Sequence, residues 1–204
     1  MISFLIRAVS TGLRAAAQLF RSRPESAELS ERLQSWYVDT GVSYYLAARW
    51  AFFTGAHPVS GNLFHHAIEM LLKGCLCHVL DERARRRFGH HLRRLWRRYK
   101  REMNDPTLSR FDETISRVDR LERLRYPEGL SSYSFQFGLR GPFGPTIGTH
   151  APPKHRQFEL AINDVDEFVA AIFAKASLNP QFFTTGFRAE ALQVLRRDNP
   201  TGIW

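Results

Sequence analysis

One stretch of the chain, residues 62–77, constrains the fold most strongly, because it reads as a helix buried on most sides. Apolar residues recur there at steps of three and four and form two neighbouring rows on a helix. A helix of this kind needs other elements packed around it, so the segment predicts a central helix in a mainly helical protein. The first row contains Leu63, Ala67, Met70, Gly74 and Cys77, and the second contains Phe64, Ile68, Leu71 and Cys75.

The remaining face of this helix carries a polar stripe. Its members are Asn62, His66, Glu69 and Lys73, at steps of four, three and four, which places their side chains in one line. Glu69 and Lys73 are spaced to form an ion pair. The stripe has two interpretations: a solvated face whose ion pair contributes about a few tenths of a kcal/mol, or a functional polar cleft.

The same periodicity predicts the other helices and one interruption. We expect a helix over 30–54, closed by Gly55 and Pro58, a third helix from about residue 89 to 103, and a fourth opened by Asp105 and Pro106. A fifth is expected from 163 to 178. Alternating residues at 133–137 and 156–160, around a loop rich in glycine and proline, predict two strands of a β-hairpin.

These elements predict a mainly α fold, an up-and-down bundle of four to five helices. A hairpin or long-loop insertion at about 129–160 precedes the last bundle helix. We expect one domain over 30–178, preceded by a basic amphipathic helix or arm over 1–29, for which a membrane-surface or targeting role is the alternative. Residues 179–204 are expected to form an aromatic-rich arm that packs on the domain or contacts a partner.

Two further properties bear on the environment of the protein. No apolar run reaches the roughly 18–20 residues needed to cross a bilayer, so we expect no transmembrane segment. The two cysteines, Cys75 and Cys77, are two residues apart. Side chains at that spacing on a helix point apart, so we expect free, buried thiols and a cytoplasmic protein.

The positive charge of the chain is concentrated in one segment. The net charge is +9, and residues 83–101 alone hold ten basic residues and no acidic one. Such an arginine-rich face is either solvated and paired with acids of the next helix, such as Asp112, Glu113 and Asp119, or it contacts phosphate. Ten charges exceed what three acids can neutralise, which favours a phosphate-bearing partner.

Four short motifs follow one another in a fixed order from about Ser43 to Phe173. They are Ala47-Ala48-Arg49, Ala67-Ile68-Glu69 with Leu72-Lys73, Gly89-His90-His91-Leu92 and Arg125-Tyr126-Pro127. In their order and spacing these motifs resemble the HEPN superfamily. The resemblance implies a bundle of four or five helices that usually forms a homodimer and is often encoded beside a nucleotidyltransferase partner. It also implies an RNase, a toxin component, or a module that binds RNA or a nucleotide.

Our leading hypothesis is a HEPN-like module that binds RNA or nucleotide phosphate through the basic segment and a polar cleft. Arginine and lysine would hold the phosphate, the histidines would orient it, and Tyr126 would supply a hydroxyl or a stacking face. A non-catalytic protein-interaction scaffold is one alternative. The predicted ligand-binding residues are Arg49, Glu69, Lys73, Arg93, Arg94, Arg97, Arg98, Arg125 and Tyr126.

A metal-independent ribonuclease or toxin is the other alternative. Active HEPN RNases carry an arginine followed by a histidine after four to six intervening residues, and no histidine follows Arg120–Arg125 at that spacing. The spacing does occur in Arg85 with His90 and in Arg86 with His91. Such a pair can cleave RNA without metal, because the histidine moves the 2′-hydroxyl proton and the arginine stabilises the phosphorane oxygens.

His90 and His91 also have a purely structural interpretation, and the sequence gives no support to several other kinds of active site. His90 and His91 at a helix start can simply cap or pack, and as neighbours on a helix one would point inward and the other outward. Histidines and cysteines on one continuous helix do not converge on a zinc ion, so no metal is expected. No phosphate loop or nucleophile elbow is found, and no cofactor is expected. The zinc candidates considered were His65, His66, Cys75, Cys77 and His78.

Overall fold

A computed structural model describes residues 27–126, 133–141, 144–145 and 156–204. Within these residues the protein is mainly helical, with seven α-helices and a small two-stranded parallel sheet, which confirms the predicted fold class at that level. Most of the predicted basic arm over 1–29, and part of the predicted insertion, lie outside the described residues.

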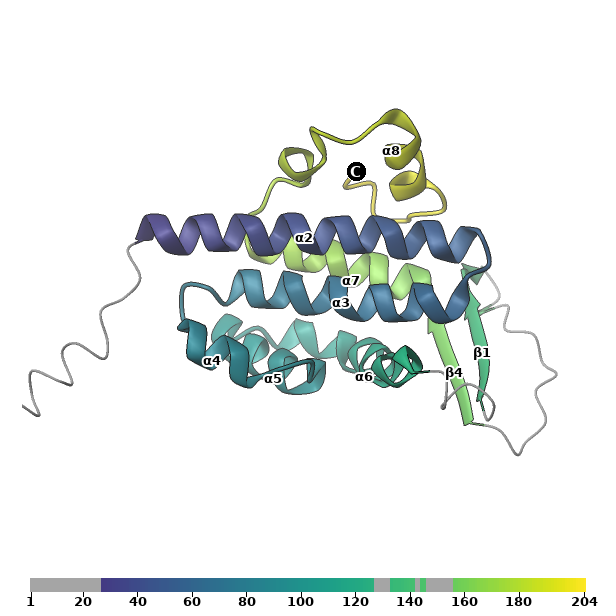
Figure 1. Cartoon of the computed structure of the whole chain (residues 1–204), viewed down its shortest axis with the longest axis horizontal. Coiled ribbons are helices and arrows are strands. Elements are labelled where there is room, and N and C mark those ends of the chain that lie inside the picture. Colours follow the sequence, from purple (N-terminus) through teal and green to yellow (C-terminus); the bar gives the residue numbers. More distant parts are fainter. Residues whose placement is uncertain (1–26, 127–132, 142–143, 146–155) are drawn as a thin grey trace, which may run out of the picture.

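Two long helices, α2 (Ala27–Phe53) and α3 (His57–Cys75), run antiparallel along the molecule (Figure 1). Gly55 has a φ of 81°, which lets the chain turn between them, and Pro58 lies in the first turn of α3. The helices approach closely where Gly41 of α2 faces α3. A Cβ atom on Gly41 would lie 2.9 Å from Leu71 Cγ and 3.2 Å from the Ala67 carbonyl oxygen. The absence of a side chain at this position therefore sets the helix spacing.

Helices α4 (Glu82–Arg87) and α5 (Leu92–Met103) follow α3. The short α4 was not predicted; the Asp81 side chain caps it by accepting a hydrogen bond from the Ala84 backbone N–H at 2.7 Å. Helix α5 is the predicted third helix, although it begins at Leu92 instead of near Gly89. It ends at Met103, and the next residue, Asn104, adopts the left-handed conformation that asparagine tolerates better than most residues.

The predicted fourth helix is divided into three consecutive pieces. A 3₁₀ helix over Pro106–Phe111 comes first, and the Asp105 side chain caps it through the Thr107 backbone N–H, as the sequence indicated. Helix α6 (Asp112–Leu121) and a second 3₁₀ helix over Glu122–Arg125 follow. The second 3₁₀ helix packs against α3.

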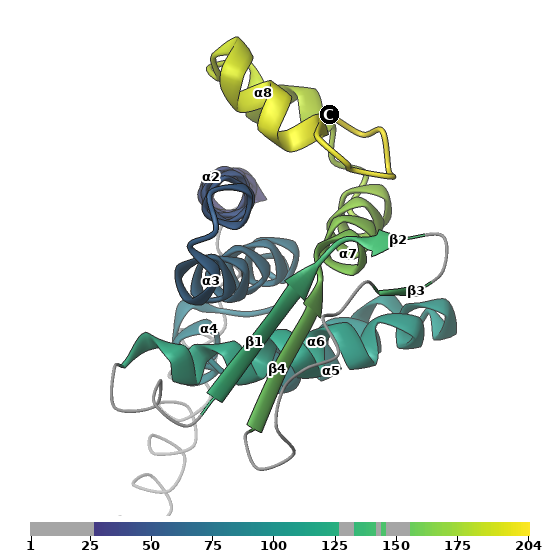
Figure 2. The same cartoon turned by 90° about the vertical axis from the view of Figure 1, so that its right-hand side faces the viewer.

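The predicted β-hairpin is wrong in the direction of pairing. Strands β1 (Tyr133–Gly138) and β4 (Arg156–Ala161) occupy the predicted positions, but they pair in parallel, with Phe137 opposite Leu160 (Figure 2). Parallel pairing needs a connection of about a dozen residues or more, and residues 139–155 provide one. Within that connection, β2 (Arg140–Gly141) and β3 (Gly144–Pro145) form a minimal antiparallel pair.

The chain then returns through α7 (Ile162–Lys175), which packs beside α3, and enters a C-terminal segment. This segment contains a 3₁₀ helix over Pro180–Thr184 and α8 (Ala189–Arg196). Both views place α8 and the C-terminus over α2, on the side away from α5 and α6 (Figures 1 and 2). The residues predicted as a C-terminal arm therefore cover one face of α2.

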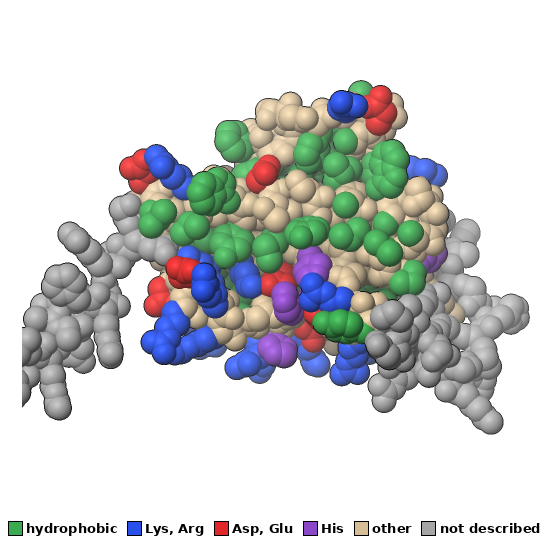
Figure 3. All heavy atoms as spheres, viewed as in Figure 1, with side chains coloured by type: hydrophobic (Ala, Val, Ile, Leu, Met, Phe, Trp, Pro, Cys, Tyr) green, Lys and Arg blue, Asp and Glu red, His purple; other side chains and the backbone are tan. Residues whose placement is uncertain are grey.

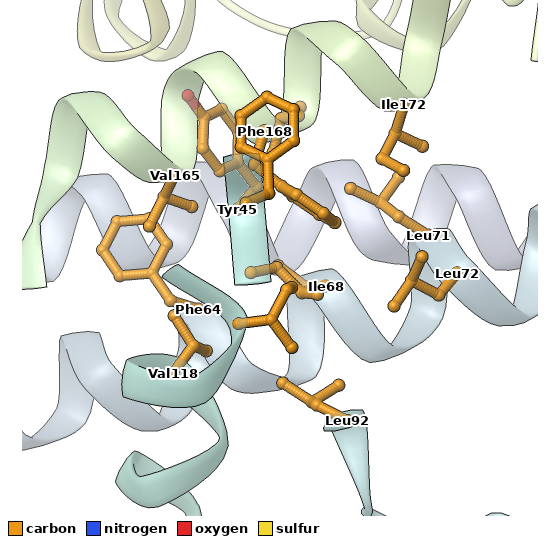
Figure 4. Packing of buried hydrophobic residues seen from close by; sticks show 14 of the residues in the cluster. Tyr45, Phe64, Ile68, Leu71, Leu72, Leu92, Val118, Val165, Phe168 and Ile172 are labelled. Atoms are coloured by element: carbon orange, nitrogen blue, oxygen red, sulfur yellow. The ribbon is translucent and has the colours of Figure 1, made fainter. Parts of the chain in front are cut away.

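The hydrophobic core lies between α2, α3, α5, α6 and α7. Phe64 and Ile68 of α3 lie between Val118 of α6 and the α7 residues Val165 and Phe168, and all five side chains are buried (Figure 4). Cys75 and Cys77 are buried and are not joined by a disulfide, as predicted. No helix in the described part of the chain combines the length and hydropathy that a bilayer crossing requires.

Candidate functional site

Glu69 lies at the centre of a polar cluster inside the helical protein. Its side chain, on α3, is only 1 % exposed. Lys73, one turn later, places its Nζ atom 2.5 Å from Glu69 Oε1 and also donates to the Gly89 carbonyl oxygen at 3.2 Å. The ion pair predicted from the four-residue spacing is therefore confirmed, and it is buried.

Three histidines surround the second carboxylate oxygen, Glu69 Oε2. His90 Nδ1 lies 2.9 Å from it, His66 Nδ1 lies 3.7 Å from it, and His65 Nε2 lies 4.0 Å from it. His90 comes from the segment before α5, whereas the other two belong to α3. We refer to His65, His66, Glu69, Lys73 and His90 as the Glu69 cluster.

The surroundings shift the pKa of two members of this cluster. Burial alone would raise the pKa of Glu69, but hydrogen bonds from His66, Lys73 and His90, together with the Lys73 charge, lower it to about 2. Burial lowers the pKa of His65 from its ordinary value, against the raising effect of the Val118 carbonyl and Glu69. At neutral pH the cluster therefore combines an ionised carboxylate with a neutral, buried imidazole.

The Glu69 cluster reaches the surface through His90, whose side chain is 50 % exposed. In the space-filling view, histidine side chains gather between the hydrophobic side chains over α2 and the lysine and arginine side chains over α4 and α5 (Figure 3). The cluster is therefore a buried charge site with one imidazole at the solvent boundary.

A second feature lies between α5 and α6. It is an open groove with a volume of about 510 Å³, which we call the α5–α6 groove. Four cationic side chains and two carboxylates line it, which leaves a net positive charge. The lining residues are His91, Arg93, Arg94, Trp96, Arg97, Lys100, Asp112, Ile115 and Asp119.

The arginines of the groove are not neutralised by its acids. Asp112 is already engaged by Lys100 Nζ, at 2.6 and 2.8 Å, and by the Trp96 indole N–H at 2.6 Å. Asp119 Oδ1 accepts a hydrogen bond from the backbone N–H of Arg93, at 3.4 Å. Among the described residues, no acidic side chain forms an ion pair with the exposed Arg93, Arg94, Arg97 or Arg101.

The adjacent residues His90 and His91 connect the two features. His90 faces Glu69, and His91 lines the α5–α6 groove. This division agrees with the expectation that neighbouring histidines at a helix start point in different directions. The contact between His90 and Glu69 therefore places the Glu69 cluster beside the end of the groove that His91 lines.

The structure places Arg49 away from both features. Its side chain is 0 % exposed, and its guanidinium binds the Asp166 carboxylate of α7 at 2.5 and 2.6 Å and the Val194 carbonyl oxygen at 3.0 Å. It also donates to the Arg197 carbonyl oxygen. A fully buried and fully engaged guanidinium cannot reach an external phosphate, so Arg49 is not part of the site described here.

Other predicted residues are distributed over the surface and the interior. Arg85 is buried and donates to the Leu80 carbonyl oxygen, whereas Arg86 is exposed and paired with Glu82 at 2.5 Å. Arg98 is paired with Glu102 at 2.5 Å. Arg85 and Arg98 are therefore already engaged within the protein.

The last predicted pair lies beyond α6. Arg125 is near Glu122, at 3.4 Å, and Tyr126 is 62 % exposed at the end of the second 3₁₀ helix. That helix packs against α3, so these residues lie on the α3 side of the protein. Neither lines the α5–α6 groove.

Sequence reasoning missed two participants. The sequence pattern names His65 only as a possible zinc ligand and not as a neighbour of Glu69. Its four-residue spacing to Glu69 nevertheless places both side chains on one face of α3. Lys100 belongs to the basic segment 83–101, but the sequence does not predict it among the ligand-binding residues. Its pairing with Asp112 depends on the packing of α5 on α6, which the sequence does not specify.

The chain matches no known protein-family model, no curated protein and no solved structure.

Proposed function

We propose that this protein is a HEPN-like helical module that binds RNA or a nucleotide through phosphate groups, with the α5–α6 groove as the contact surface. The observation that carries the proposal is a groove lined by Arg93, Arg94 and Arg97, none of which forms an ion pair with an acid in the described residues. Unpaired guanidinium groups suit phosphate, because their planar N–H donors match its oxygens. A locally positive surface also attracts a polyanion from a distance.

The Glu69 cluster supports this surface without contacting phosphate directly. Glu69 and Lys73 are almost fully buried, and Lys73 donates to the carbonyl oxygen of Gly89, immediately before the two histidines. This contact and the Glu69–His90 hydrogen bond hold the start of α5 against α3. Lys73 and Glu69 therefore position His91 and the first arginines, in place of the direct phosphate contact expected from the sequence.

The resemblance to HEPN domains supports the choice of ligand class and the finer description of the fold as a bundle. It also implies a homodimer and a nucleotidyltransferase partner. Two exposed tryptophans on α2, Trp36 at 67 % and Trp50 at 51 % exposure, are apolar side chains that a homodimer contact would bury. Light scattering of wild type and of Trp36→Ser/Trp50→Ser measures this directly: a dimer that becomes a monomer supports the contact, and a wild-type monomer contradicts it.

Binding to phosphate is tested by the salt dependence of RNA affinity. We expect fluorescence anisotropy with a labelled single-stranded RNA to show an affinity that falls steeply with salt, with a log–log slope of about −0.7 for each phosphate contacted. The variant Arg94→Gln/Arg97→Gln should reduce the magnitude of that slope by about 1.4, since two contacts are lost. A flat salt response would contradict the proposal.

A matched control separates a groove from general positive charge. The variant Arg32→Gln/Arg188→Gln removes the same charge from exposed positions on α2 and just before α8. We expect its RNA affinity and slope to remain close to those of wild type. Equal losses in both double variants would show that net charge, and not the groove, determines binding.

The ribonuclease alternative has one observation in its favour. The buried Glu69 carboxylate accepts a hydrogen bond from the half-exposed His90, and a carboxylate of this kind orients an imidazole for general acid–base catalysis. Its arginine partner at the predicted spacing, Arg85, is buried against Leu80. Incubating RNA in EDTA with wild type, His90→Ala and His91→Ala tests this alternative. Cleavage lost in one variant supports it, and no cleavage by wild type contradicts it.

A further inference from the structure

The Glu69 cluster also contains three atoms that could act together as metal ligands. Two imidazole nitrogens and one carboxylate oxygen, from His65, Glu69 and His90, all lie within 4.8 Å of one another. His65 and Glu69 share one face of α3, and His90 approaches from the start of α5. Three ligands from two separate segments therefore converge on one point inside the fold.

One ring nitrogen of His65 has no hydrogen-bond partner among the residues that the structure describes. Its Nδ1 atom lies 3.3 Å from the Val118 carbonyl oxygen, which can only accept a hydrogen bond, so Nδ1 carries the proton. The Nε2 atom then presents a lone pair, and it is buried with no hydrogen-bond partner in the described part of the chain. An unsatisfied buried polar group costs about 1–3 kcal/mol.

The same hydrogen bond is a feature of metal-binding histidines. A histidine that ligates a metal through one ring nitrogen commonly donates from the other to a backbone carbonyl, which fixes the tautomer. The orientation of the Glu69 carboxylate is likewise fixed by a neighbouring group. Lys73 holds Oε1 at 2.5 Å, so Oε2 is the oxygen that faces the imidazoles.

We propose that His65 Nε2, Glu69 Oε2 and His90 Nδ1 bind one divalent metal ion of the zinc class. In a tetrahedral zinc site, ligands at about 2.0–2.2 Å from the metal lie about 3.4 Å from one another. The distances from Glu69 Oε2 to the two nitrogens, 2.9 and 4.0 Å, lie on either side of that value.

The ligand set and its surroundings define the ion further. Two imidazoles with one carboxylate suit zinc and its neighbours better than magnesium or calcium, which prefer oxygen ligands alone. The exposed side of His90 leaves a fourth position open to solvent, as in zinc sites that are not purely structural. His66 borders the site at 3.7 Å from Oε2, and the positive charge of Lys73 opposes the ion and limits its affinity.

The metal site shares no residue with the lining of the α5–α6 groove, although Glu69 and His90 belong both to it and to the contacts that hold the start of α5. It excludes the ribonuclease alternative whenever the ion is bound, because a metal on His90 Nδ1 replaces the Glu69–His90 hydrogen bond. Metal binding and metal-free cleavage are therefore separate measurements with different outcomes.

The test is a titration of the full-length protein, freed of metal with EDTA and dialysed, with Co²⁺ as a spectroscopic substitute for zinc. We expect visible absorption bands of low-symmetry cobalt that saturate at one equivalent and disappear when Zn²⁺ is added. The variants His90→Ala and Glu69→Gln should each weaken binding by about tenfold or more. His90 is half exposed, so its replacement leaves the folded core intact.

Two histidine controls match these variants. His91→Ala changes the adjacent residue, and His78→Ala changes a histidine on the surface that contacts Gln34. Both should bind Co²⁺ as wild type does. Absence of the cobalt bands in wild type, an unchanged affinity in His90→Ala, or an equal loss in His78→Ala would each overturn the proposal.

Discussion

Two buried charge networks lie on opposite sides of the α2–α3 pair, and they differ in how completely the protein satisfies them. The Arg49 network, formed by Tyr45, Arg49 and Asp166, joins α2 to α7 and to the C-terminal segment. None of these three side chains is exposed, and each of their buried polar atoms has a hydrogen-bond partner in the described part of the chain. In the Glu69 cluster, by contrast, His65 Nε2 has no hydrogen-bond partner within the described ranges, and His90 is half exposed.

This difference separates a structural role from a functional one. A closed network whose donors and acceptors all find partners fixes the packing of the elements it joins. Through Arg49, α2 holds the segment that contains Val194 and Arg197. In Figure 1 this segment, with α8, lies over α2. An open network keeps binding capacity, and the Glu69 cluster keeps it beside a groove lined by arginines.

The largest effect is expected from breaking the closed network. Arg49→Met leaves the Asp166 carboxylate buried without its cation, and loss of one partner of a buried ion pair costs about 3–5 kcal/mol. Urea unfolding should show this loss, and adding Asp166→Asn should recover part of it because no unpaired charge remains. The control Arg32→Met, at an exposed position on α2, should change stability by less than about 0.5 kcal/mol. A similar small change in Arg49→Met would show that the network is not structural.

A somewhat smaller effect is expected where the two long helices meet between the networks. Gly41→Val inserts a branched side chain where even a Cβ atom would lie 2.9 Å from Leu71 Cγ. Overpacking of this kind costs about 1–3 kcal/mol, and we expect the upper part of that range because a backbone oxygen also blocks the site. Ser43→Val, exposed on the same helix, is the control for the β-branched side chain. Equal unfolding midpoints for the two variants would contradict the close approach.

Opening the Glu69 cluster should cost less than breaking the closed network, and the cost should depend on pH. Glu69→Gln removes the charge that Lys73 and His90 contact, but Lys73 keeps its bond to the Gly89 carbonyl oxygen, so we expect a loss of about 1–2 kcal/mol at pH 7. The folded-state pKa of Glu69, about 2, lies below its ordinary value of 4.5. Its contribution is therefore present above pH 4.5 and is lost as the pH falls toward 2.

Urea unfolding of wild type and Glu69→Gln between pH 7 and pH 2 measures this contribution. The stability difference between the two proteins should shrink as the pH falls from 4.5 to 2. Glu113→Gln, which removes an exposed carboxylate paired with Arg117, serves as the control and should show a much smaller difference. A difference between wild type and Glu69→Gln that stays constant with pH would contradict the low pKa.

The smallest effect on stability is expected in the groove itself. Arg94 and Arg97 are exposed and have no acidic partner among the described residues, so Arg94→Gln/Arg97→Gln should change the unfolding free energy by less than about 0.5 kcal/mol. Urea unfolding checks this expectation. A loss above 1 kcal/mol would mean that these arginines are structural, like Arg49.

Local sequence patterns predicted the elements of the fold better than their arrangement. The apolar periodicity around Leu71 and Ile68 identified α3, and the four-residue spacing of Glu69 and Lys73 predicted their ion pair, because both depend only on neighbours along one helix. The parallel pairing of β1 and β4 is a long-range contact that local patterns do not specify, because alternating residues read the same in either direction.

The roles of the charged side chains depended even more on contacts distant in the sequence. Arg49 resembled a ligand-binding residue until Asp166, more than a hundred residues later, was placed opposite it. Asp166 was itself a signal, since it is a charged residue beside Val165 and Val169 on a helix that is otherwise mostly apolar. His65 was recoverable from its spacing to Glu69, whereas the contribution of His90 required the fold.

The most direct measurement of the comparison between the two networks is a ¹H–¹⁵N NMR titration with a short single-stranded RNA. The account predicts chemical-shift changes at His91–Lys100 and at Asp112–Asp119, on both sides of the α5–α6 groove, and none at Tyr45–Arg49 or in α8. Shifts concentrated around Arg49 and α8, or no saturable shifts at RNA concentrations well above those of the protein, would contradict it.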